Sequence, residues 1–136
     1  MTLSERFNTL ERLFYLLQTT NSIVEKRQYL KELPAEMSDD VQYVFEVLSG
    51  QHKLGYTYVK IDTNDDLPTE FENKTIKEYL APLNTCNLLN DWSTGRIIEC
   101  CQRCRWFGDI VEGIVNRTYK LGIGKSVLPK DGLGAM

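Results

Sequence analysis

Apolar side chains recur at helical spacing along most of the chain, and this pattern predicts an all-α fold. In residues 3–18 they fall three or four positions apart, as on the buried face of a helix. The residues of this face are Leu3, Phe7, Leu10, Phe14 and Leu17. Thr2, followed three positions later by Glu5, predicts a capping box at the start of the helix.

Two further helices are expected before residue 51. Ser22 and Glu25 predict a second capping box, and Pro34 predicts the end of that helix. Along it follow Val24, Arg27, Leu30 and Leu33. We expect Ser38 to cap a third helix and Gly50 to end it. Its buried stripe is predicted to be Val41, Val44, Phe45 and Leu48.

The second half of the chain predicts three more helices after an irregular stretch, L-G-Y-T-Y-V-K-I. One covers residues 74–83, and the next is capped by Ser93 or Thr94 and broken by Gly108. The last begins near Asp109, ends at Gly122 and precedes a short additional helix. We therefore expect one domain, an irregular bundle of about six to seven short helices.

Composition agrees with a folded domain. The 136 residues suit one compact unit, and 42% hydrophobic with 26% charged residues argues against disorder. The first residues lack the apolar run of a signal peptide, and no stretch reaches transmembrane length. We therefore expect a cytoplasmic protein with reduced cysteines.

Charge is distributed unevenly. The net charge is −3, which disfavours a nucleic-acid binder, but residues 95–136 hold 7 Lys/Arg against 4 Asp/Glu and are basic. This asymmetry permits a local phosphate-binding face. The alternative is that the charged clusters are ordinary solvated helix faces, and charge alone favours this alternative.

The residues that carry enzyme or metal chemistry are sparse. Cys101 and Cys104 have C-x-x-C spacing, but one such pair is half a zinc site, and the adjacent Cys100 points about 100° away on a helix. His52 is the single histidine and nothing in the sequence pairs it with a cysteine, so we do not expect a Cys–His nucleophile. G-I-G-K-S lacks the spacing of a phosphate-binding loop of nucleotide-hydrolysing enzymes. We expect no catalytic residue, metal site or cofactor in this chain.

The segment R-T-Y-K-L-G-I-G-K-S is the strongest candidate for a binding site. Gly122 and Gly124 allow the backbone to approach a surface, and Lys125 and Ser126 lie near a helix start whose free N–H groups suit phosphate. Arg117 and Lys120 are expected on one face of the preceding helix. The alternative is that Gly122 is a plain helix cap and the cations complement the helix dipole. The spacing supports both interpretations equally.

A second basic point lies at the start of the helix that Ser22 caps. Lys26 and Arg27 place positive charge near a helix N-terminus, where an anion would relieve the conflict with the helix dipole. Three other arginines are expected to be solvated helix charges, namely Arg96, Arg103 and Arg105.

Several segments together resemble the N-terminal domain of phage and bacterial ATP-dependent DNA ligases. They are T-T-N-S-I-V-E-K-R-Q-Y-L-K-E-L, G-Y-T-Y-V-K-I, N-T-C-N-L-L-N and I-V-N-R-T-Y-K-L-G-I-G, in this order over most of the chain. The resemblance implies an all-helical domain, residues 1–128, that binds nicked duplex DNA across the minor groove in repair and replication. Residues 129–136 would be a tail or the start of a linker.

Three DNA contacts follow from this resemblance. Gly122, Ile123, Gly124 and Lys125 would form a loop on the DNA backbone. Ser22 and Lys26 would make a second phosphate contact, and Asn84 with Thr85 a third. The family has arginine and glycine where this chain has Cys86 and Asn90, which puts the third contact in doubt.

The ligase chemistry itself is not expected in this chain. The family adenylates a lysine in K-x-D-G, whereas Lys130-Asp131-Gly132 lacks the intervening residue. ATP and Mg²⁺ would belong to a separate adenylation domain, which would be a partner alongside nicked DNA, with no membrane involved. This chain alone is therefore expected to be inactive as a ligase.

Two alternatives remain open. A helical protein-interaction module or phage accessory protein without DNA binding agrees with the charge of −3 and predicts that Lys26, Lys120 and Lys125 do not converge. A helix-turn-helix regulator would place the segment after Gly124 in a major groove, but Pro129 leaves that helix too short.

Overall fold

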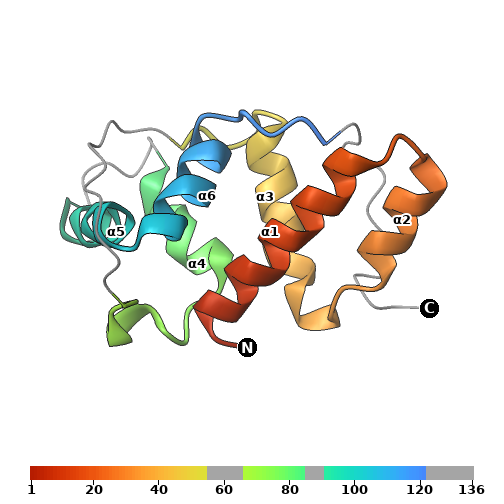
Figure 1. Ribbon diagram of the computed structural model, residues 1–136. Coiled ribbons are helices and arrows are strands. Elements are labelled where there is room, and N and C mark those ends of the chain that lie inside the picture. Colours follow the sequence, from red (N-terminus) through yellow and green to blue (C-terminus); the bar gives the residue numbers. More distant parts are fainter. Residues whose placement is uncertain (55–65, 85–90, 122–136) are drawn as a thin grey trace.

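The predicted all-α class is confirmed by a computed structural model of the chain, which describes residues 1–54, 66–84 and 91–121 (Figure 1). Within these residues it contains helices and isolated turns but no β-strand. The α-helices are α1 (Leu3–Thr19), α2 (Ile23–Lys31), α3 (Ser38–Leu48), α4 (Ile76–Leu80), α5 (Asp91–Arg103) and α6 (Arg105–Val115). Short 3₁₀ turns occur at Ala35–Met37, Thr69–Phe71 and Ala81–Leu83.

Helix α1 forms as the sequence predicts and lies at the centre of the bundle. Its capping box is complete, because the Thr2 hydroxyl accepts from the Glu5 amide at 3.2 Å and the Glu5 carboxylate accepts from the Thr2 amide at 2.9 Å. All five residues of the predicted stripe are buried. Helices α2, α4 and α6 pack against α1, which therefore links the two halves of the chain.

Tyr79 of α4 is the centre of the core. It is fully buried, and its ring meets Phe7 and Phe71 edge to face, with ring centres 5.7 and 5.3 Å apart. Its hydroxyl lies 3.3 Å from the Cys101 sulfur of α5. The short helix α4 therefore joins α1 to α5 through one aromatic side chain.

A buried ion pair joins α1, α3 and α4. The Asp40 carboxylate is 1% exposed and accepts from Arg6 Nη1 at 2.7 Å and from the Lys77 amide at 3.1 Å. Arg6 Nη1 also donates to the Glu36 carbonyl at 3.1 Å. Hydrogen bonds on both partners make this burial of charge tolerable.

Helix α2 begins where predicted but buries a different face. Ser22 is its N-cap, accepting from the Glu25 amide at 3.2 Å, while the Glu25 carboxylate accepts from the Thr20 hydroxyl instead of completing a capping box. Val24 is 76% exposed, and Arg27 is exposed too, whereas Lys26 is 5% exposed. Of the four residues that follow along this helix in the sequence, Leu30 and Leu33 are therefore buried, whereas Val24 and Arg27 face solvent.

Helix α3 ends as expected but begins differently. Ser38 is its first residue and not its cap, because a 3₁₀ turn leads directly into the helix. Gly50 has a φ of 90° and ends the helix, with its amide bonded to the Val47 carbonyl at 3.0 Å. This left-handed position is the one that glycine favours.

The boundary between α5 and α6 lies at Cys104, not at Gly108. Cys104 has an extended backbone, with φ −92° and ψ 93°, and its buried sulfur lies 3.8 Å from that of Cys100 and 3.5 Å from the Asp66 carbonyl oxygen. Helix α6 continues through Gly108, and α5 starts before Ser93 and Thr94, so neither residue caps it. The two helices are therefore separated at Cys104, which makes tertiary contacts, and not at a glycine.

Helix α6 ends at Val115, seven residues before the predicted end. Arg117 has a φ of 56°, its amide bonds to the Ile114 carbonyl at 3.1 Å, and the Thr118 amide bonds to the Gly113 carbonyl at 3.0 Å. These two bonds form the helix ending in which glycine is usual at the left-handed position. Arg117 and Lys120 therefore follow the helix and do not share a helical face, contrary to the prediction.

Candidate nucleic-acid interface

The segment after α6 crosses the bundle toward the start of α2. In Figure 1 the blue chain of residues 116–121 passes from α6 over the ends of α3 and α1. The Tyr119 ring lies on Phe14 of α1, with ring centres 4.5 Å apart. Leu121, where the described segment ends, is buried. The chain immediately before Gly122 is therefore fixed against α1.

One hydrogen bond joins this segment to α2. Lys26 Nζ donates to the Leu121 carbonyl oxygen at 2.8 Å, across 95 residues of sequence. Within the described part of the chain, no ion pair joins Lys26 to a carboxylate. The structure therefore brings together the first turn of α2 and the residue that precedes G-I-G-K-S.

The other predicted contact residues around this junction differ in their environment. Ser22 is partly exposed, but its hydroxyl serves the helix as the N-cap. Arg27 and Lys120 are exposed. Five of the predicted residues lie outside the described ones, namely Gly122, Ile123, Gly124, Lys125 and Ser126. Two exposed cations thus belong to the elements that meet at Lys26 and Leu121.

Arg117 lies near the start of the segment, beside the end of α3. Its Nη1 atom is 3.2 Å from the position that a Cβ on Gly50 would occupy. The helix endings of α3 and α6 are therefore neighbours. Arg117 is exposed and its side chain reaches toward α3.

The third predicted contact is described only in part. Asn84 follows the 3₁₀ turn Ala81–Leu83 and forms an isolated antiparallel bridge with Leu54. Thr85, its predicted partner, lies outside the described residues, as do Cys86 and Asn90. The bridge gives Asn84 a backbone role.

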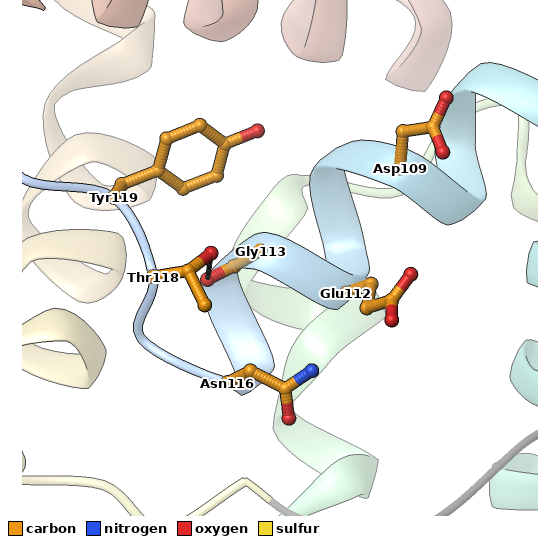
Figure 2. Close-up of a pocket in the computed structure, with 6 residues that line it drawn as sticks. All are labelled: Asp109, Glu112, Gly113, Asn116, Thr118 and Tyr119. Atoms are coloured by element: carbon orange, nitrogen blue, oxygen red, sulfur yellow. Dashed lines mark hydrogen bonds between the residues drawn. The ribbon is translucent and has the colours of Figure 1, made fainter.

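The same segment also borders an acidic pocket that the sequence interpretation missed. Figure 2 shows the Tyr119 ring, Thr118 and one side of α6 around it. The pocket has a volume of about 270 Å³, and its lining residues are Asp109, Glu112, Gly113, Asn116, Thr118 and Tyr119. The positions 109, 112 and 116 fall on one helical face, which is the signal that would have predicted it.

The charge of this pocket disfavours phosphate. Burial raises the pKa of Tyr119, and the nearby carboxylates of Glu11 and Asp109 raise that pKa further. A negative field is therefore present at the tyrosine. The charge of the acidic pocket therefore disfavours an anionic ligand at this part of the segment.

Cys100 is buried, and His52 packs against neighbouring side chains. Burial raises the pKa of the Cys100 thiol, which opposes nucleophilic reactivity. His52 stacks on Tyr43, with ring centres 4.8 Å apart, and its Nε2 lies 2.9 Å from a Glu46 carboxylate oxygen. Within the described residues, no group of three or more potential metal-ligating side chains is arranged around a common point.

Among the described helices, none is both long and apolar enough to cross a membrane. No known protein family, curated protein or solved structure matches the chain.

Proposed function

We propose that this chain binds nicked duplex DNA through phosphates, without catalysing a reaction. The surface would consist of Arg27 of α2, the exposed Lys120 and the segment that follows Leu121, with Arg117 at its edge. Such contacts hold the sugar-phosphate backbone and carry little sequence information.

The contact between Lys26 and Leu121 is the observation that supports this proposal. The sequence interpretation predicts phosphate contacts at two places almost a hundred residues apart, and Lys26 Nζ donates to the Leu121 carbonyl oxygen at 2.8 Å. Lys26, at the first place, therefore contacts the residue directly before the second place.

The distribution of charge agrees with weak, backbone-directed binding. Arg27 and Lys120 are exposed near the junction, while the carboxylates of Asp109 and Glu112 line the pocket beyond Tyr119. With few cations available, binding should be weak at physiological salt and should weaken further as salt rises.

Fluorescence anisotropy of a labelled nicked duplex, measured across salt concentrations, tests the proposal. We expect Lys125→Glu to weaken binding about tenfold or more and to reduce the slope of log K against log salt by about one or more. Lys77→Glu is the matched control, because Lys77 is exposed on α4 and makes no described ion pair. An intact duplex measures preference for the nick.

Absence of binding at low salt would refute the proposal, as would equal effects of the two lysine substitutions. A protein-interaction module would then be the better interpretation of this chain's function. The observation that favours this second function is that Ile23 and Val24, at the first turn of α2, are 42% and 76% exposed. An Ile23→Ser and Val24→Ser double variant would separate it, because losing these apolar groups should leave phosphate binding unchanged.

A further inference from the structure

Three cysteines lie close together where α5 meets α6. Cys100, Cys101 and Cys104 are thiols, with no disulfide among them. The Cys101 sulfur lies 3.3 Å from the Tyr79 hydroxyl, inside the core. Cys100 and Cys104 instead contact each other, with sulfur atoms 3.8 Å apart. This pair has no part in the proposed DNA surface, so its role has to be sought separately.

The backbone around the pair meets the requirements of a disulfide. The Cys104 amide bonds to the Cys100 carbonyl at 2.8 Å, which is helical spacing and places the two Cα atoms about 6 Å apart. A disulfide needs Cα atoms about 4.4–6.8 Å apart and sulfur atoms about 2 Å apart. The sulfur atoms therefore have to approach by nearly 2 Å. Cys104 ends α5 with an extended backbone, at ψ 93°, so this adjustment falls at a helix end.

A small cavity gives access to the buried pair. Cys100 and Cys104 are 2% and 3% exposed, but both line a cavity of about 100 Å³. Its lining also includes Asp66, Arg96 and Arg103. Because a water molecule takes up about 30 Å³ of liquid, hydrogen peroxide fits this space, whereas a disulfide between two peptides does not. The cavity therefore admits a small oxidant and excludes a large one.

We propose that Cys100 and Cys104 form a reversible modification site, a dithiol that hydrogen peroxide oxidises to a disulfide. One thiol loses its proton and attacks a peroxide oxygen. The O–O bond breaks, the sulfur becomes a sulfenic acid, and the departing hydroxide takes the proton to form water. The second thiol then loses its proton and attacks the sulfenic sulfur, whose hydroxide leaves as a second water. Two thiols are thereby oxidised and one peroxide is reduced.

Burial slows the first step, whereas proximity favours the second. Burial raises the pKa of the Cys100 thiol, although the nearby charge of Arg96 opposes this shift. Thiolate is therefore scarce at pH 7. Once a sulfenic acid has formed, the second sulfur already lies 3.8 Å away, so the disulfide closes within one molecule. We expect the sulfenic acid not to accumulate.

Oxidation also changes how α5 holds the segment before α4. The reduced Cys104 thiol donates to the Asp66 carbonyl oxygen at 3.5 Å, and a disulfide has no S–H to donate. Asp66 lies three residues before the 3₁₀ turn Thr69–Phe71, and the Phe71 ring packs on Tyr79. The disulfide therefore removes one link between α5 and the segment that leads into this turn.

Mass spectrometry of the peroxide-treated chain tests the assignment. Trypsin cuts after Arg103 and separates Cys104 from Cys100, so only a disulfide can hold the two peptides together. We expect this linkage in the unaltered chain and in Cys101→Ser, and we expect dithiothreitol to reverse it. Cys100→Ser should yield no linkage to Cys104. Cys101→Ser is the matched control, because Cys101 is buried in the same helical turn.

Three results would overturn the inference. They are the absence of this linkage after peroxide treatment, its persistence in Cys100→Ser, and a bond from Cys104 to Cys86 in place of Cys100. Circular dichroism checks that the serine variants fold, and Cys100→Ala replaces Cys100→Ser if the latter does not. None of these measurements depends on DNA binding.

A comparison of two oxidants tests the role of the cavity. The rate at which the Cys104 peptide becomes oxidised is measured in the folded chain and in the chain unfolded by urea. Folding should slow oxidation by glutathione disulfide at least about tenfold more than oxidation by hydrogen peroxide, because the cavity admits only the smaller molecule. Equal slowing of both oxidants would show that the pair reacts only after unfolding, and would overturn access through the cavity.

Discussion

Replacement of Asp40 tests the most concentrated electrostatic contact of the bundle. Asp40→Ala removes the acceptor of two hydrogen bonds, at 2.7 Å from Arg6 and 3.1 Å from the Lys77 amide. The Arg6 side chain is only 11% exposed, so its charge would remain buried without a carboxylate partner. Its Nε atom already lacks a hydrogen-bond partner among the described residues. Loss of one member of a buried pair should therefore be severe.

The expected magnitude follows from this burial. Breaking a buried pair by removing one partner costs about 3–5 kcal/mol, and we take about 4 kcal/mol. For 136 residues the unfolding entropy is roughly 290 cal/mol/K, so Tm should fall by about 14 °C. Asp39→Ala is the matched control, because Asp39 is exposed in the same helical turn. Its loss should cost about 0.5 kcal/mol and lower Tm by about 2 °C.

Urea and thermal unfolding, followed by circular dichroism at pH 7, measure both substitutions. An Arg6→Met and Asp40→Leu double variant should recover at least half of the loss, because it leaves no buried charge. The reasoning would be refuted if Asp40→Ala and Asp39→Ala lowered Tm equally. It would also be refuted if the double variant lost as much stability as the sum of the losses measured for Arg6→Met alone and Asp40→Leu alone.

The remaining predictions concern helix ends. Arg117→Gly should raise the free energy of unfolding by about 0.5 kcal/mol, because Arg117 has a left-handed backbone. Asn116→Gly, at φ −84°, should lower it by a similar amount, and thermal melts that gave both changes the same sign would contradict this. Backbone hydrogen bonds at Thr2 and Thr75 lower the pKa of Glu5 and of Glu78 below the ordinary 4.5, so both groups stabilise the fold above that pH and lose this effect as pH falls through their folded values. A Glu5→Gln and Glu78→Gln variant should therefore lose less Tm than the unaltered chain between pH 5 and about 3; parallel curves would contradict this.

The sequence predicts α1 well because its cap and its apolar face are local properties. Thr2 and Glu5 satisfy each other within one turn, and the spacing of the stripe requires no distant partner. Helix α2 differs, since its buried position at Lys26 depends on a carbonyl 95 residues away. No periodicity argument places a lysine inside and Val24 outside.

The ends of the last two helices could not be predicted for a similar reason. The rule for helix endings expects glycine, and the chain offers Gly108 and Gly122. The structure instead breaks at Cys104, which makes buried contacts, and at Arg117, which adopts the strained conformation itself. For the candidate interface, the sequence placed Arg117 and Lys120 on one face of a helix, whereas the structure places both residues after the helix ends.

The contact between Lys26 and Leu121 has a consequence for the order of folding. Closing a loop of 95 residues costs about 2 kcal/mol more entropy than closing one of ten, whereas each helix forms from neighbours in sequence. Because loop closure must precede the gain from distant contacts, we expect the helices to form first and the segment 116–121 to dock late. During synthesis, α2 therefore emerges long before the carbonyl that its buried ammonium needs, and the proposed DNA surface is assembled only as the last described residues join the bundle.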